Sequence, residues 1–136
     1  MFAILPPQAD PCVNDWVLQT NCVTELLPER ALIRAAFLDE YLMTNGKPIG
    51  PLHGVPISVK EHMGMEACDL NAGFVAWVGR LSEEDSHILK ILWGAGAVFY
   101  VRTTQPQSLM HLETSGNLYG CVVVGKFEVD VLMCEG

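Results

Sequence analysis

The sequence contains few basic residues. Eight lysines and arginines stand against sixteen aspartates and glutamates, which gives a formal net charge of -8 at pH 7. A chain this acidic has no positive surface field that would attract a phosphate backbone or an anionic lipid surface. We therefore expect no nucleic-acid partner.

Long hydrophobic runs are absent as well. The longest covers residues 93–101 and includes two glycines, whereas a membrane-spanning helix needs roughly 20 apolar residues. The N-terminal stretch MFAILPP lacks the basic and apolar regions of a secretory signal. We expect no membrane span and a cytoplasmic location.

Signatures of disulfides and metal sites are also missing. The five cysteines are odd in number, widely spaced and without a C-x-x-C pair, so we expect reduced thiols. His53, Glu61 and His62 match neither H-E-x-x-H nor another zinc-ligand spacing. The sequence therefore predicts no metal site and no cofactor.

The composition is that of one globular domain, because half of the 136 residues are hydrophobic and only 18% are charged. Prolines in residues 1–20 predict an irregular N-terminal segment. Pro28 then suits a first helical turn and Gly46 a helix end. The apolar residues at helical spacing between them are Ala31, Ala35, Leu38 and Leu42.

A second helix is expected after Ser82 and Asp85, which match a capping box. Gly94 or Gly96 should end this helix. Its predicted inward residues are Ile88, Leu89, Leu92 and Trp93.

Two segments predict strands. Residues 55–60 alternate with period two, which places Val55, Ile57 and Val59 on one face and Lys60 on the other. Residues 97–101 are nearly all apolar, which is typical of a strand covered on both faces. The order strand, helix, strand predicts a partly parallel sheet, and hence an α/β fold with flanking helices.

The remaining segments carry weaker signals. Residues 61–81 show no sustained period and contain three glycines, which predicts a long loop of the kind that is often functional. A short helix is expected around residues 107–112, and a hairpin about Gly125 and Lys126.

Lys60 is the first candidate for chemistry. A lysine at the end of an apolar strand either covers apolar surface with its stem while its ammonium group stays in water, or is used in chemistry. Burial disfavours the ammonium form and lowers the pKa, which makes lysine a general base. Spacing alone does not separate these two interpretations.

Four segments of the sequence bear on the role of Lys60. Residues 50–62 read GPLHGVPISVKEH, residues 94–98 read GAGAV, residues 101–106 read VRTTQP, and residues 113–120 contain E-T-S-G-N followed by Gly120. In this order they resemble the amidase signature family, in particular its acetamidase-like members, over residues 21–120. The resemblance implies a partial amidase domain there, a carboxamide substrate in the parent enzyme, and Lys60 as the catalytic lysine.

The resemblance also implies what is missing. In the family, a serine attacks the amide carbonyl, and a second serine in a cis peptide relays its proton to the lysine. No two serines are adjacent in this sequence, and residues 121–136 diverge from the family. Val101 and Arg102 stand where most relatives have Gly and Lys, so the resemblance does not fix the local backbone geometry there. We expect an N- and C-terminally incomplete amidase that is inactive alone.

Other interpretations remain open. Ser58 lies on the Lys60 face of its strand, but no oxyanion donors are near it in sequence. Ser115 lacks a nucleophile elbow. Cys68 or Cys121 with a histidine would make a thiol hydrolase, although such combinations are frequent by chance. The alternative to an enzyme is a non-catalytic chain with a binding role, prone to self-association through exposed apolar surface.

Overall fold

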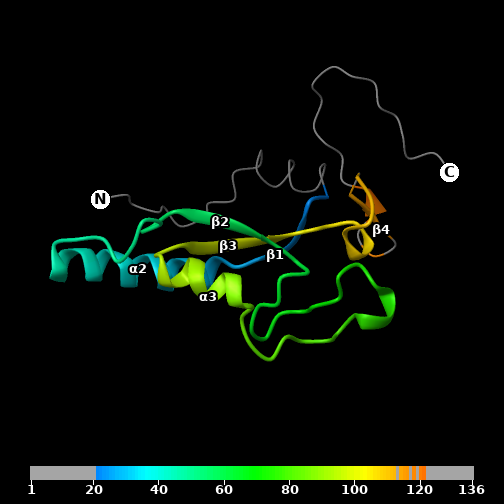
Figure 1. Cartoon of the computed structure of the whole chain (residues 1–136), viewed down its shortest axis with the longest axis horizontal. Helices are drawn as coiled ribbons and strands as arrows, with labels where there is room; N and C mark the ends of the chain where they lie inside the picture. The colour runs from blue at the N-terminus through cyan, green and yellow to red at the C-terminus, as the bar shows by residue number, and fades with distance from the viewer. Residues whose placement is uncertain (1–20, 113, 117, 119, 122–136) are drawn as a thin grey trace, which may run out of the picture.

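The computed structural model describes residues 21–112, 114–116, 118 and 120–121. The elements alternate between strands and helices along the chain (Figure 1). In order they are β1 (Val23–Leu26), α2 (Pro28–Asn45), β2 (Pro56–Lys60), the 3-10 turn η1 (Val75–Trp77), α3 (His87–Gly94), β3 (Val98–Thr103), the 3-10 turn η2 (Gln107–Leu109), β4 (Ser115–Gly116) and β5 (Gly120–Cys121).

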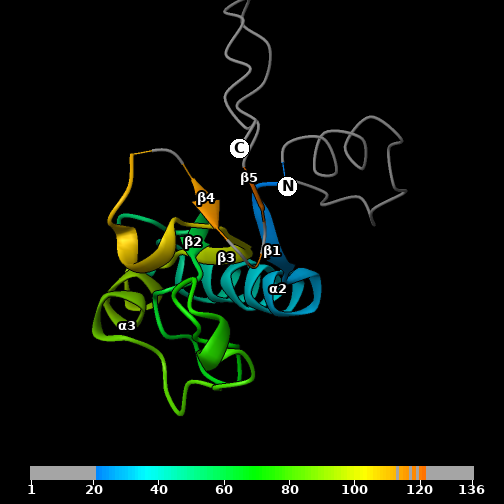
Figure 2. The ribbon, with the colours of Figure 1, turned by 90° about the vertical axis from the view of Figure 1, so that its right-hand side faces the viewer.

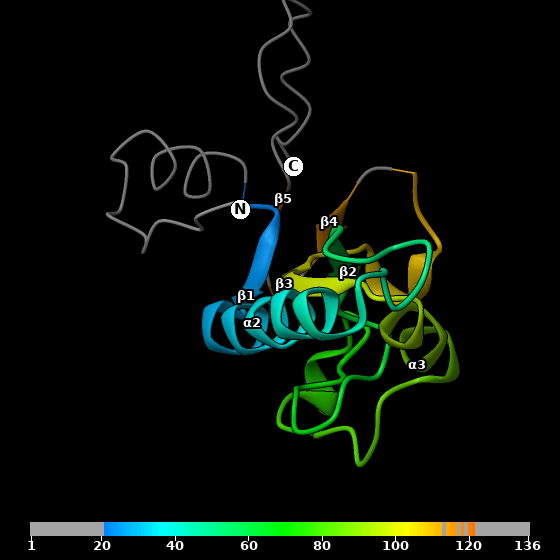
Figure 3. The same cartoon turned by 90° about the vertical axis from the view of Figure 1, so that its left-hand side faces the viewer.

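The main sheet has three strands in the order β1-β3-β2. β2 pairs with β3 in parallel, and β1 pairs with β3 antiparallel, so the sheet is mixed. α2 and α3 lie on the same side of this sheet (Figures 2 and 3). The predicted α/β class and the parallel pairing are confirmed, whereas β1 was not predicted. β4 and β5 form a separate antiparallel pair.

α2 has the bounds that its sequence predicts. Pro28 occupies the first turn, and Gly46 closes the helix at φ 65°, donating its N–H to Leu42 O at 2.9 Å. Leu38 is buried as expected, but Leu42 is 41% exposed, so the predicted apolar stripe is not buried to its end.

Arg34 is the other buried residue of α2 besides Leu38, and the predicted apolar stripe did not include it. Its Nη2 donates to Trp93 O at 2.5 Å and its Nε to Ala97 O at 3.4 Å. A buried guanidinium is tolerated here because carbonyl oxygens near the end of α3 accept its hydrogen bonds.

The predicted capping box does not form. α3 begins at His87 with Ser86 at the N-cap and no side-chain cap hydrogen bond. The Ser82 hydroxyl instead donates to Glu84 O at 2.8 Å, and Asp85 accepts from the backbone N–H of Glu66 at 2.8 Å. Both side chains thus serve the loop before the helix.

α3 and the sheet enclose the hydrophobic core. Its fully enclosed members are Val59, Met65, Leu89, Ala97 and Phe99. Leu92 and Trp93 pack against this cluster as predicted, and Gly94 is the last residue of the helix. Ile88, which the helical pattern placed inward, is 45% exposed, because α3 turns Leu89 rather than Ile88 toward the sheet.

The long segment between β2 and α3 is a loop interrupted only by η1 in the described residues, as predicted. The helix expected around residues 107–112 is shorter, a single 3-10 turn. Residues 1–20 and the hairpin predicted about Gly125 and Lys126 lie outside the described residues. No helix in the described ranges is long and apolar enough to cross a membrane.

Candidate active site

Lys60 is the last residue of β2 and is exposed. The strand alternates at its end as predicted, because Val59 is only 2% exposed on the core face while Ser58 and Lys60 are exposed on the other. The prediction for Val55 is wrong, since this residue precedes β2 and is 41% exposed. Lys60 lies opposite Thr103 in the parallel register. The sheet therefore presents the lysine at the carboxyl ends of two parallel strands, where α/β proteins commonly place functional side chains.

The backbone next to Lys60 is hydrogen-bonded on both sides. Met63 N donates to Lys60 O at 3.0 Å, and Glu61 N donates to Thr103 O at 2.9 Å. The strand end is thus closed by a tight turn on one side and by β3 on the other.

Glu61 points the opposite way and is 1% exposed. Its Oε1 accepts from Asn71 N at 2.6 Å, and its Oε2 accepts from Ala72 N at 2.9 Å and from Gln105 Nε2 at 2.7 Å. A buried carboxylate is stable when donors surround it in this way. Glu61 thereby ties the end of β2 to the long loop and to the segment after β3.

Arg102 is fully buried beside Glu61. Its Nη1 donates to Glu25 Oε2 at 2.8 Å, and its Nη2 donates to Glu61 O at 2.5 Å and to Asp69 O at 2.8 Å. β3 continues through Val101 and Arg102, and its pairing is irregular beside them, because the register with β2 shifts between Phe99 and Val101 and the register with β1 shifts between Arg102 and Thr103. The cluster of Glu61, Asn71, Arg102 and Gln105 is hereafter called the buried polar cluster.

Sequence reasoning placed Glu61 among possible loop ligands and missed this cluster. One signal was present: an acidic residue directly after a strand that otherwise buries its apolar side chains. Its partners are ten to 44 positions away, so no local pattern identifies them.

His53, Glu61 and His62 are not brought together as a metal site. Glu61 is taken up by the buried polar cluster, and His53 Nδ1 accepts from Ile49 N at 3.1 Å. Among the described residues, no three side chains of the ligand types His, Cys, Asp and Glu are placed to hold a metal ion. Burial, reinforced by the nearby charge of Lys60, lowers the pKa of His62, and Glu61 opposes that shift.

The environments of the other candidate nucleophiles show no feature that would activate them among the described residues. Ser58 is exposed on the Lys60 side of β2, and Ser115 begins the short strand β4. Burial raises the pKa of the half-buried Cys68 thiol, which disfavours the reactive thiolate. The side chain of Cys121 lies outside what the structure describes.

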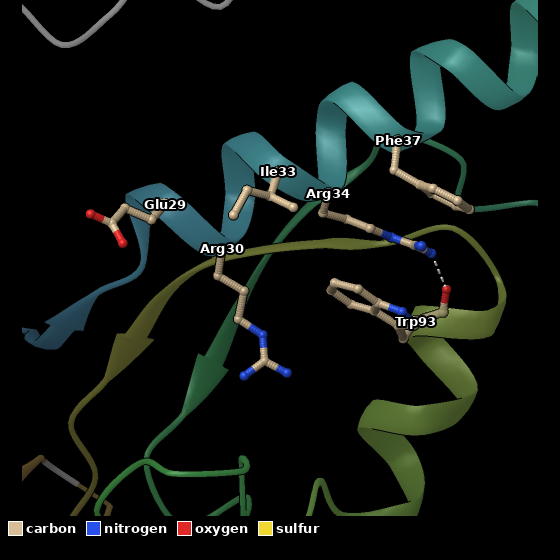
Figure 4. A pocket seen from close by; sticks show the side chains of 6 residues that line it. All are labelled: Glu29, Arg30, Ile33, Arg34, Phe37 and Trp93. Atoms are coloured by element: carbon tan, nitrogen blue, oxygen red, sulfur yellow. Dashed lines mark hydrogen bonds between the residues drawn. The ribbon is translucent and has the colours of Figure 1, made fainter.

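A shallow pocket lies between α2 and α3 (Figure 4), and Lys60 is not among the residues that line it. It is lined by Glu29, Arg30, Ile33, Arg34, Phe37 and Trp93. Its two guanidinium groups are already engaged, since Arg34 stacks 4.0 Å from the Trp93 ring centroid and Arg30 pairs with Asp85 at 2.9 Å. The pocket therefore serves to pack the two helices together.

Comparison with known proteins gives a consistent result. The family model described as Amidase matches residues 16–124. A Schizosaccharomyces pombe protein, provisionally named amidase C550.07, is 53% identical over 103 residues. The acetamidase of Emericella nidulans is 43% identical over 104 residues. Each alignment covers 76% of this chain and 19% of the relative, so the chain spans about a fifth of their length.

Solved structures give the same result, and one of them is a fatty acid amide hydrolase. It superposes with a TM-score of 0.74 at 40% identity, covering 79% of this chain and 19% of that protein. A peptide amidase from Stenotrophomonas maltophilia superposes with a TM-score of 0.54 at 32% identity, over 65% of this chain and 18% of the other. The chain belongs to the amidase signature family, and its mixed sheet with two helices is a part of that fold.

Proposed function

We propose that this chain is part of a hydrolase that cleaves the carbon–nitrogen bond of carboxamides, with Lys60 as its general base. The observation that carries the proposal is the position of Lys60, exposed at the end of a parallel strand whose backbone is hydrogen-bonded on both sides. The likeness to an acetamidase over the same residues supports it.

In this reaction, a serine oxygen bonds to the amide carbonyl carbon while its proton passes, through a second serine, to the neutral lysine amine. The tetrahedral intermediate collapses, the carbon–nitrogen bond breaks, and the amine leaves with a proton. Water then releases the acyl group from the serine. A base next to the nucleophile is the element that activates a weak hydroxyl nucleophile in serine hydrolases.

These 136 residues contribute the base and not the hydroxyl pair. No two serines are adjacent in the sequence, and Ser58 shares a rigid strand with Lys60. A strand cannot fold its own i and i+2 residues around a substrate carbonyl, so Ser58 does not replace the missing nucleophile. We expect no amide hydrolysis by these residues alone.

A chimera tests the role of Lys60. In the Emericella nidulans acetamidase, the segment that matches this chain would be replaced by residues 21–120 of this chain. The chimera should hydrolyse acetamide, and Lys60→Ala should lower kcat by at least about 100-fold, the usual range for loss of a general base. Lys47→Ala, a lysine in the exposed turn after α2, is the matched control and should retain activity.

The non-catalytic alternative has one observation in its favour, the many large apolar side chains that are exposed. Ile33, Met43 and Leu112 are examples at 72%, 87% and 101% exposure. Sedimentation of the 136-residue chain tests whether this surface drives self-association. Acetamide hydrolysis by this chain alone, abolished by Lys60→Ala, would contradict our account of the missing serines.

A further inference from the structure

Both polar groups of the peptide that joins Lys60 to Glu61 are hydrogen-bonded, and so is the carbonyl oxygen of Glu61. Lys60 O accepts from Met63 N, Glu61 N donates to Thr103 O, and Glu61 O accepts from the Arg102 guanidinium. The Glu61 side chain then anchors the same point to the loop at Asn71 and Ala72. A strand end usually frays because its backbone N–H and C=O groups face water. At the end of β2 these groups are bonded within the protein, which opposes fraying.

The chemistry of the anchor requires a carboxylate. Three N–H donors converge on the two oxygens of Glu61, those of Asn71, Ala72 and Gln105. A glutamine has one acceptor oxygen and an amide that itself donates, so it would turn a donor toward at least one of these donors. Burying a carboxylate is costly, and a contact that only held the loop in place could be made by a neutral side chain.

We propose that Glu61 is a positioning residue for Lys60, and that the buried polar cluster holds the lysine backbone in the geometry that proton transfer requires. This rests on the proposed function of Lys60. Lys60 and Glu61 are neighbours on opposite faces of the strand end, so a shift of the buried carboxylate moves the exposed amine with it. Displacements of about 1 Å in a reacting group can lower a rate by roughly 100-fold.

The hydrogen bonds by which the buried polar cluster holds the backbone of Lys60 and Glu61 are hereafter called the clamp. Hydrogen–deuterium exchange on the full 136-residue chain tests the clamp without an enzyme assay. In Glu61→Gln, the amides of Glu61 and Met63 should exchange at least about tenfold faster than in the wild type, while those of α2 stay within about twofold. Gln105→Met removes a single donor at nearly constant volume and should give a smaller acceleration at the same amides. Glu40→Gln, the same chemical change at an exposed position on α2, is the control.

The acetamidase chimera provides the second readout. Glu61→Gln should lower kcat by roughly 10- to 100-fold with KM within about twofold, because the acetamide site itself is unchanged. Glu61→Asp keeps the charge but shortens the reach, and it should recover part of the loss. Glu40→Gln should match the parent in both constants.

The two readouts separate the two ideas. Amides of Glu61 and Met63 that exchange equally fast in wild type and Glu61→Gln would overturn the clamp. A Glu61→Gln chimera whose kcat matches that of Glu40→Gln would overturn its role in positioning. A parent chimera in which Lys60→Ala has no effect would refute the proposed function, while the exchange data would still decide whether the clamp exists.

Discussion

Arg102 on β3 and Glu25 on β1 form an ion pair of 2.8 Å in which the arginine side chain is fully buried and the glutamate is 38% exposed. The two residues are direct partners in the antiparallel register. The pair therefore fastens β1, the strand that the sequence did not predict, to the centre of the sheet.

Replacing Arg102 by methionine should lower the free energy of unfolding by about 2–3 kcal/mol. The loss of one partner from a buried pair costs more than this when the other partner is also buried, but Glu25 can regain water. The carbonyls of Glu61 and Asp69 also lose their donor. Urea denaturation followed by circular dichroism measures the change.

Lys90→Met is the matched control for this prediction, because Lys90 forms an ion pair with Glu84 in which both side chains are exposed. Its urea midpoint should equal that of the wild type within error. Equal midpoints for Arg102→Met and Lys90→Met would show that the buried pair does not stabilise the sheet.

Gly96 stands where the turn after α3 passes against the backbone of His53. It has a φ of +101°, and a Cβ there would lie 2.7 Å from His53 Cα. Gly79 has a comparable φ of +84° with open space around it. Gly79→Ala should therefore cost only the left-handed backbone strain, about 1–2 kcal/mol.

Gly96→Ala should cost about 1–3 kcal/mol more than Gly79→Ala, because it adds an overlap with a backbone that cannot rotate away. Thermal melts of the two variants, each compared with the wild type, give the difference. Identical melting temperatures would mean that the turn after α3 opens readily, which would contradict the packing seen here.

The helices show which features a sequence can predict. Pro28 and Gly46 act through their own backbone, so the ends of α2 follow from local rules. Arg34 can be buried because the carbonyl oxygens of Trp93 and Ala97 accept its hydrogen bonds. These acceptors lie 59 and 63 positions away in the sequence, so no local pattern predicts the burial. The same holds for β1, a strand of four residues that exists only through its pairing with β3.

The candidate site divides in the same way. Alternation placed Lys60 at a strand end on the face opposite the core, and this is confirmed. The buried polar cluster was not predicted, since Glu61 meets Gln105 across 44 positions and Arg102 meets Glu25 across 77. The catalytic role of Lys60 came from resemblance to a family and stays a prediction.

Leu89 and Ile88 are neighbours on α3 with opposite environments. Leu89 is fully buried in the core, and Ile88 is 45% exposed. Leu89→Ala should lower the free energy of unfolding by about 3 kcal/mol through lost burial and a cavity. Ile88→Ala, on the same helix, should change it by less than about 0.5 kcal/mol. Urea denaturation that ranks them in the opposite order would contradict the helix orientation in which Leu89 rather than Ile88 faces the core.

The lowered pKa of His62 predicts how the stability of the chain depends on pH. Burial, with help from Lys60, lowers the pKa of His62 below its ordinary value of 6.5. The folded chain then binds fewer protons than the unfolded chain as the pH falls below about 6.5, so protonation favours unfolding. The contribution of neutral His62 is fully present above pH 6.5 and is lost as the pH falls through the lowered pKa.

His62→Gln removes this titration, and its urea midpoint should fall less than that of the wild type between pH 7.5 and pH 5. Because carboxylates that titrate below pH 5 affect both proteins equally, the difference between the two profiles isolates the histidine. Parallel profiles across this range would mean that the imidazole of His62 is as well solvated in the folded chain as in the unfolded one. A wild-type midpoint that rises as the pH falls would reverse the sign of the shift and place a stabilising partner for the imidazolium at the turn after Lys60.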